Sequence, residues 1–302
     1  MSTLSLVVWI IAYPVIIFCI GVLLGGYERK FSARVERRIG PSWIQPFYDV
    51  IKLMSKKTNV SHGYMHDVAI LMLLGGTLLT LYFVPVPGFS YFSQFGDFLV
   101  ISYLLLIPSL GMALGVGETA NPNGSIGISR ALQMLAGYEV PFILTFIGVA
   151  MKEQTTSMLD IINIQQAGGF MAWGLIAHPL LGVAALIALQ GMLNEKPFEV
   201  IVAPHEIATG PMTEMGGKYL GIMFIQHLIA LPLELTIYIN LFLGGATNWL
   251  EYLVKLFVVW TALISVNLVF GRFRIDSAVK FMWKISLPLA ALGVIGIMLN
   301  IA

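Results

Sequence analysis

Charged residues are scarce in this chain of 302 residues: Asp, Glu, Lys and Arg make up 11% of it, whereas hydrophobic residues make up 58%. A soluble domain usually carries about 25% charged residues, so this chain has too little polar surface to remain dissolved in water. The mean hydropathy of +0.85 agrees with that conclusion. The composition therefore excludes an ordinary soluble protein and predicts an integral membrane protein.

Cysteine is almost absent, since Cys19 is the only one. A single cysteine cannot close an internal disulfide, and iron–sulfur clusters need several thiolates. The five histidines form no pattern typical of a metal site. A surplus of positive charge is missing too, because the formal net charge is +1, and a nucleic-acid-binding face needs such a surplus. We expect no metal or redox cofactor in this chain and no nucleic-acid partner.

Long apolar runs are abundant, and a helix needs about 20 mainly apolar residues to cross a membrane. The alternating pattern of outer-membrane barrels is missing, and the first run lacks the flanks of a cleaved signal peptide. We predict an all-α integral membrane protein with eight transmembrane helices in a single domain, residues 1–302. The predicted spans are Leu4–Gly26, Val68–Val84, Phe98–Gly117, Met134–Met151, Phe170–Met192, Tyr219–Leu243, Leu250–Phe270 and Trp283–Ile301.

The positions of Lys and Arg predict the orientation, because these residues are retained on the cytoplasmic side of the membrane. Fifteen of the 17 lie in the loops that follow the first, third, fifth and seventh runs, and the exceptions are Lys152 and Lys255. Both termini should therefore lie outside. The cytoplasmic loops 27–67 and 194–218 are long enough to form an interface with partner proteins.

Three carboxylates lie within or at the end of apolar runs, where an ionisable group costs about 2.5–3.5 kcal/mol and indicates function. Glu139 lies early in the fourth run, Glu234 in the middle of the sixth, and Glu118 at the end of the third. Pro141 and Pro232 stand two residues from the first two acids and free backbone carbonyls there. Such a site can hold a proton relay, although an interfacial position explains Glu118 equally well.

The two long cytoplasmic loops are unlike plain solvated loops. In 194–218, acids and a histidine alternate with apolar residues and glycines, so we expect this loop to fold back against protein and to add Glu199, Glu206 and Glu214 to the relay. In loop 27–67, the retention of Lys and Arg on the cytoplasmic side of the membrane is enough to explain the cations. The apolar residues between 39 and 54, at about helical spacing, further suggest an amphipathic helix that docks on a partner or at the membrane surface.

Short motifs then follow one another in order along the chain. Arg130, in the loop after the third run, precedes Tyr138-Glu139-Val140-Pro141 of the fourth run by eight residues. Loop five contains Pro197-Phe198-Glu199, followed by Glu206, Gly210, Glu214 and Gly217. The first loop contains Glu28, Arg29, Lys30, Arg37-Arg38-Ile39-Gly40-Pro41, Gln45-Pro46, Asp49 and Lys52. Together these motifs resemble the H-type membrane subunit family, also called subunit 1, of respiratory complex I and of its relatives, the energy-converting membrane-bound hydrogenases.

The resemblance implies a multi-subunit ion-translocating oxidoreductase in the plasma membrane of a prokaryote. Iron–sulfur clusters and a nickel–iron site would lie in partner subunits, which resemble hydrogenase large and small subunits, and antiporter-like membrane subunits and lipid would surround the chain. Spans two to six would form an antiporter-like half-channel. Docking to the cytoplasmic arm would involve Glu28, Arg29, Lys30, Arg37, Arg38, Gln45, Asp49, Lys52 and Arg130.

Departures from the quinone-reducing branch favour the hydrogenase-type branch. Only Ser42, Trp43 and Ile44 separate Gly40-Pro41 from Gln45-Pro46, where quinone-reducing relatives carry a longer insert. The acidic stretch after Pro-Phe-acid is replaced by the apolar residues 200–203. The resemblance therefore implies a linker subunit that couples electron transfer from ferredoxin to proton or sodium translocation. A quinone-binding subunit of complex I is the alternative, and a stand-alone transporter is a third possibility.

Overall fold

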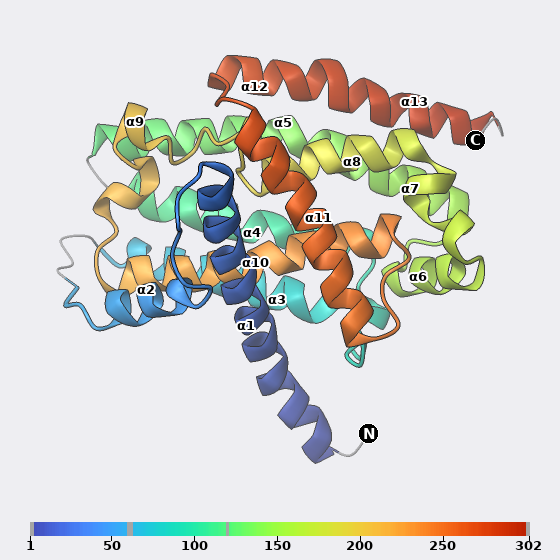
Figure 1. Cartoon of the computed structure of the whole chain (residues 1–302), viewed down its shortest axis with the longest axis horizontal. Helices are drawn as coiled ribbons and strands as arrows, with labels where there is room; N and C mark the ends of the chain where they lie inside the picture. The colour runs from blue at the N-terminus through green and yellow to red at the C-terminus, as the bar shows by residue number, and fades with distance from the viewer. Residues whose placement is uncertain (1–2, 59–62, 119–120, 300–302) are drawn as a thin grey trace. The chain divides into compact units, whose positions relative to one another are not determined.

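The computed structural model describes residues 3–58, 63–118 and 121–299 (Figure 1). Within these ranges all regular structure is helical, and the only β-type contacts are isolated bridges. The all-α prediction is confirmed. Seven helices in the described ranges are long and apolar enough to cross a membrane. The chain is thus a multi-pass membrane protein by its helices, whereas the eighth span and the external position of the termini stay predictions.

The long helices match the predicted runs in place but extend beyond them at several ends. The first runs on to Val35 and the fourth begins at Pro122, because charged and polar residues continue a helix beyond the membrane without being apolar. The long helices are α1 (Thr3–Val35), α3 (Met65–Phe83), α4 (Phe98–Gly117), α5 (Pro122–Glu153), α10 (Lys218–Phe242), α11 (Trp249–Val269) and a last helix built of α12 (Ile275–Phe281), the π-helical segment Met282–Ser286 and α13 (Leu287–Met298).

The predicted fifth span, Phe170–Met192, is wrong as one continuous helix. The structure divides it into a 3-10 turn (Phe170–Ala172), α7 (Gly174–Ala177) and α8 (Pro179–Met192). Proline disfavours the helical conformation in the residue before it, and His178 accordingly has φ −134° and ψ 68°. The 14 residues of α8 rise about 21 Å, which is less than the roughly 30 Å of a hydrocarbon core.

Short helices fill the connections. The amphipathic helix expected in the first loop is α2 (Gln45–Met54), whose Pro46 and Val50 are buried while Tyr48 and Ile51 are exposed. After α5 comes α6 (Met158–Ala167). The remaining short elements are a 3-10 turn (Ser93–Phe95), α9 (Pro204–Ile207) and a 3-10 helix (Gly210–Glu214).

The chain forms two compact units. Unit 1 comprises residues 1–81, 104–128 and 204–233, and unit 2 comprises residues 82–103, 129–203 and 234–302. The boundary within α10 falls directly before Glu234, two residues after Pro232. The predicted single transmembrane domain over residues 1–302 stays a prediction.

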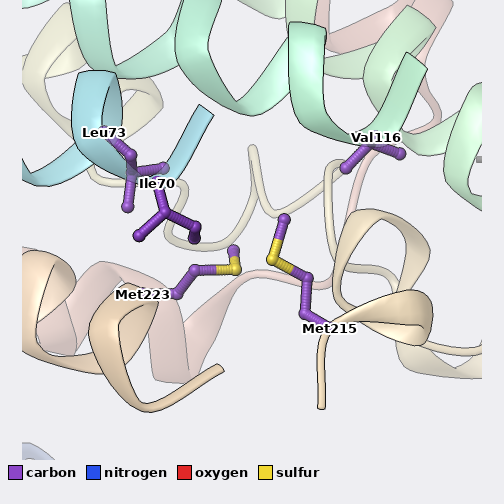
Figure 2. Packing of buried hydrophobic residues seen from close by; sticks show 5 residues of the cluster. All are labelled: Ile70, Leu73, Val116, Met215 and Met223. Atoms are coloured by element: carbon purple, nitrogen blue, oxygen red, sulfur yellow. The ribbon is translucent and has the colours of Figure 1, made fainter. Parts of the chain in front are cut away.

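Unit 1 is held together by apolar contacts between α3, α4, α10 and the segment before α10. Figure 2 shows one cluster, in which Ile70 and Leu73 of α3 face Met223 of α10, with Met215 and Val116 on the other side. Helix α2 packs against α1. A β-carbon at Gly26 of α1 would overlap the carbonyl oxygen of Trp43, so glycine permits the connection before α2 to lie directly on α1.

Unit 2 is built around α8, which packs along α13 (Figure 1). Gly148 of α5 and Gly293 of α13 both approach the side chain of Leu181, so small residues let three helices meet closely. At the end of α10, polar side chains donate hydrogen bonds to backbone carbonyls. Gln165 donates to the carbonyl of Leu241 (2.7 Å), and Lys255 donates to the carbonyls of Leu243 (2.7 Å) and Gly245 (2.6 Å).

Candidate docking and coupling sites

An ion pair attaches the loop-one helix to the first membrane helix within unit 1. Nη1 of Arg29 donates to Oδ2 of Asp49 at 2.6 Å, and Nε2 of Gln45 donates to Oδ1 at 3.1 Å. Partial burial raises the pKa of Asp49, but the hydrogen bonds from Arg29 and Gln45 and the charges of Arg29 and Lys52 outweigh it and hold that pKa below its ordinary value. Three predicted docking residues thus serve an internal contact.

Three other cations of the predicted docking surface face solvent. Arg37, Arg38 and Lys52 are exposed, and Arg38 pairs with Glu36, which is also exposed. Glu28 and Lys30 are half-buried on the last turns of α1. Arg130 belongs to unit 2, on α5, and is half-buried. The exposed cations next to the apolar face of α2 therefore make the surface that fits a docking role best in unit 1.

Glu118 has a defined backbone partner in unit 1. Its Oε2 accepts a hydrogen bond from the backbone N–H of His66 at 3.1 Å, at the beginning of α3. The His66 ring lies 4.9 Å from the ring of Tyr219, edge to face, and its Nδ1 lies 3.3 Å from the carbonyl oxygen of Gly115. Free N–H groups at a helix start favour a carboxylate, so these contacts explain Glu118 as a helix cap. Sequence reasoning missed the role of His66.

Glu199 is anchored in unit 2 by the connection between α11 and α12. Nη2 of Arg272 donates to Oε2 of Glu199 at 2.9 Å, and both side chains are largely buried. The backbone N–H of Phe273 donates to the carbonyl of Pro197 at 2.8 Å. The ring of Phe198 packs against that of Phe273, with the two ring centroids 5.9 Å apart. Arg272 counted in the sequence only as a topology signal, because nothing local linked it to residues 73 positions earlier.

The first half of loop five is thereby folded against protein, as predicted. Gln190 at the end of α8 donates to the carbonyls of Lys196 (2.7 Å) and Leu263 (3.2 Å). The amide of Asn267 on α11 donates to Glu195. These contacts and the Arg272 ion pair join the segment 194–201 to α8 and α11. We call this arrangement the loop-five clamp.

Glu139 and Glu234 both belong to unit 2, and each lies inside a long apolar helix. Glu139 is half-buried on α5, beside Pro141, and Glu234 lies on α10 after Pro232. Both helices continue through their prolines. Within the described residues, Oε2 of Glu234 is buried without a hydrogen-bond partner. Of the other predicted relay acids, Glu206 is exposed on α9, and Glu214 lies in the 3-10 helix that follows.

Known membrane subunits are similar to this chain over most of its length. The H subunit of the NADH-quinone oxidoreductase of Helicobacter pylori strain J99 is 30% identical, over 90% of this chain and 91% of that protein. Its counterpart in Carboxydothermus hydrogenoformans is 25% identical, over 87% and 80%. These relatives are subunits of oxidoreductase complexes, in agreement with the enzyme class predicted above.

A solved structure is similar over almost the entire chain. One chain of the membrane-bound sulfane sulfur reductase (MBS), an archaeal respiratory membrane complex, superposes with a TM-score of 0.92 at 37% identity, covering 97% of this chain and 99% of that chain. The family model described as NADH dehydrogenase matches residues 7–298. The chain therefore belongs to this NADH dehydrogenase family, which includes the H-type membrane subunit of complex I-like enzymes.

Proposed function

We propose that this chain is the membrane linker subunit of a redox-driven ion pump. Electron transfer in a cytoplasmic arm, from ferredoxin to a hydrogenase-type site, would drive proton or sodium translocation through the membrane domain. The observation that carries the proposal is the full-length similarity to a chain of a respiratory membrane complex at 37% identity. The relatives named as quinone oxidoreductase subunits are 25–30% identical.

Two local features of the structure support the branch without quinone turnover. The short connection before α2 lies directly on α1, with the ring of Trp43 5.7 Å from that of Tyr27. In loop five, Val200 and Ala203 are 1% and 0% exposed and belong to apolar packing in unit 2. The loop-five segment is thus buried by packing, and the backbone of the loop-one connection lies against α1, which leaves both little freedom to line a chamber for a large ligand.

The proposed relay consists of acids distributed over both units. Glu139 and Glu234 are its intramembrane members, and Glu206 and Glu214 connect it to the cytoplasmic side. Glu118 and Glu199 contribute less to it, because each is bound to a fixed partner. A buried carboxyl without a fixed partner can take up a proton and release it again, and Glu234 fits that description best.

Redox chemistry belongs to partner subunits in this proposal, since the chain has only one cysteine. Iron–sulfur clusters and the nickel–iron site would lie in hydrogenase-like large and small subunits that dock on the exposed cations of loop one. Antiporter-like subunits would continue the ion path, and the chain itself would have eight spans, external termini and a half-channel in spans two to six. The location would be a prokaryotic plasma membrane.

A quinone-binding subunit is the alternative function, favoured by the names of the Helicobacter and Carboxydothermus relatives. The two functions are separated by one assay on the intact complex: it is reduced with ferredoxin, and a soluble quinone is added. We expect no quinone reduction above that of a preparation lacking the cytoplasmic arm. Robust reduction that stops with an inhibitor of the quinone site would replace the proposal by the alternative.

A further inference from the structure

Unit 2 contains a second buried group that can carry a proton, and it lies away from the predicted acids in the sequence. His178 stands at the break between α7 and α8 and is 6% exposed. Neither Nδ1 nor Nε2 has a hydrogen-bond partner in the described protein. A neutral imidazole carries one donor and one acceptor, and buried polar atoms of this kind are almost always satisfied by protein or water.

The backbone N–H and carbonyl of His178 are both hydrogen-bonded, so its main chain needs no ligand. The N–H of His178 donates to the carbonyl of Gly174 at 2.9 Å, and its carbonyl accepts from Gly182 at 3.1 Å. Gln165 accepts from the N–H of Gly174 at 3.4 Å. Only the ring is left over. We infer that the break encloses water next to the imidazole, because irregular backbone at membrane depth is tolerated where it is buried or borders water.

We propose that His178 is a hydrated proton-binding site of unit 2, separate from the glutamate relay. One ring nitrogen accepts the excess proton of a neighbouring protonated water, and the other nitrogen releases its own proton to a second water. One proton is thereby passed on, and no net charge remains on the ring. The site therefore suits transfer of protons rather than their storage. This inference rests on the proposed ion pumping and adds a station to it.

The first test concerns water alone and does not depend on pumping. In a map of the intact complex that resolves ordered water, we expect water within about 3 Å of Nδ1 or Nε2. A ring that is packed dry on both nitrogens, or bonded to a group of another subunit, overturns the inference.

The second test separates a proton site from a merely hydrated one. His178→Phe keeps a ring of similar size without nitrogens, and His178→Gln keeps a donor and an acceptor but cannot be protonated at neutral pH. With the complex assembled and electron transfer intact, we expect both variants to lower the number of protons moved per electron at least threefold. The control is Thr145→Val in the same unit, which removes a buried hydroxyl bonded only to its own helix, to the carbonyl of Phe142, and should leave the ratio unchanged.

Each outcome decides. If His178→Gln pumps normally while His178→Phe does not, the ring only orders water, and the proton site is wrong. If both variants pump normally and Glu234→Gln does not, this inference fails while the proposed function stands. If Glu139→Gln and Glu234→Gln also pump normally, the proposed relay fails as well. Should His178→Phe fail to assemble, His178→Gln and the water map still decide between these outcomes.

Discussion

The two units differ in how their polar side chains are bonded. In unit 1, Glu118 is bound by the N–H of His66, Asp49 by Arg29, and Asp67 accepts from the hydroxyl of Tyr219. Every buried side-chain atom found without a partner in the described residues lies in unit 2, on His178, Gln190, Glu234 and Arg272. Because such atoms need water or a proton, we expect the intramembrane part of the proposed relay to lie in unit 2 and unit 1 to act mainly as a support.

The largest expected effect comes from Glu234 in unit 2. Glu234→Gln keeps the size and most hydrogen-bonding capacity of the side chain but removes its titratable proton. We expect the complex to assemble and transfer electrons, yet to lose redox-driven ion pumping in sealed vesicles. Glu139→Gln should act in the same way.

The matched control is Asp276→Asn, an exposed acid of unit 2, which should leave the ratio of ions to electrons unchanged. An unchanged ratio for both Glu139→Gln and Glu234→Gln would contradict the relay and the contrast between the units. A structural acid would instead lower the amount of complex while the assembled part pumped normally.

The loop-five clamp should show the next largest effect, on stability. Arg272→Met leaves the carboxylate of Glu199 without its charged donor, and hydrogen bonds to charged groups contribute about 1.5–3 kcal/mol. We expect a lower Tm of the purified complex and more rapid proteolysis within 194–201. The double variant Arg272→Met with Glu199→Gln should regain part of the loss, because no charge is then left unpaired. No recovery in the double variant would argue that Arg272 acts elsewhere.

Charge reversals in loop one should have two distinct effects, which depend on the residue that is changed. Reversing Arg37 or Arg38 to Glu should weaken the binding of the soluble arm by about 0.2–1 kcal/mol for each charge pair that is lost. The arm should be released more readily at high salt, since exposed charges are screened there. Arg29→Glu should instead loosen α2, because Arg29 is bound to Asp49. Limited proteolysis of 39–54 distinguishes the two. An arm that stays bound after both Arg37 and Arg38 are reversed would remove these residues from the docking surface.

The pH dependence of the Arg29 contact follows from the lowered pKa of Asp49. A carboxyl with a lowered pKa in the folded state contributes stability that is fully present above its ordinary value of 3.8. That contribution is lost as the pH falls through the lower, folded value. Attachment of α2 should therefore be constant near neutral pH and weaken only below about pH 4, and Asp49→Asn should abolish this acid-dependent step.

Sequence patterns predicted the helical class, the place of the long spans and the amphipathic α2, because apolar length and helical spacing are local properties. They failed at Phe170–Met192, where hydropathy averages over a break that His178 and Pro179 create. They also missed Arg272 and His66, whose partners lie 73 and 52 positions away. The apolar neighbours of Glu234 in the sequence indicated that it is buried. They could not distinguish it from Glu199, because Glu199 is bound by a donor that is distant in the sequence, Arg272.

The smallest effect is expected in the core of unit 1, where packing rather than polarity is at stake. Met223 faces Ile70 and Leu73 (Figure 2), and methionine adapts its shape to irregular gaps. Met223→Leu conserves volume and should cost less than about 1.5 kcal/mol, whereas Met223→Ala leaves a cavity and should cost about 2–5 kcal/mol. Thermal unfolding of the complex measures both. Neither variant should change the ratio of ions to electrons, because unit 1 at this point only supports the fold. A loss of pumping in Met223→Leu with normal Tm would show that the apolar core of unit 1 takes part in coupling, and the division between a supporting and a conducting unit would then be wrong.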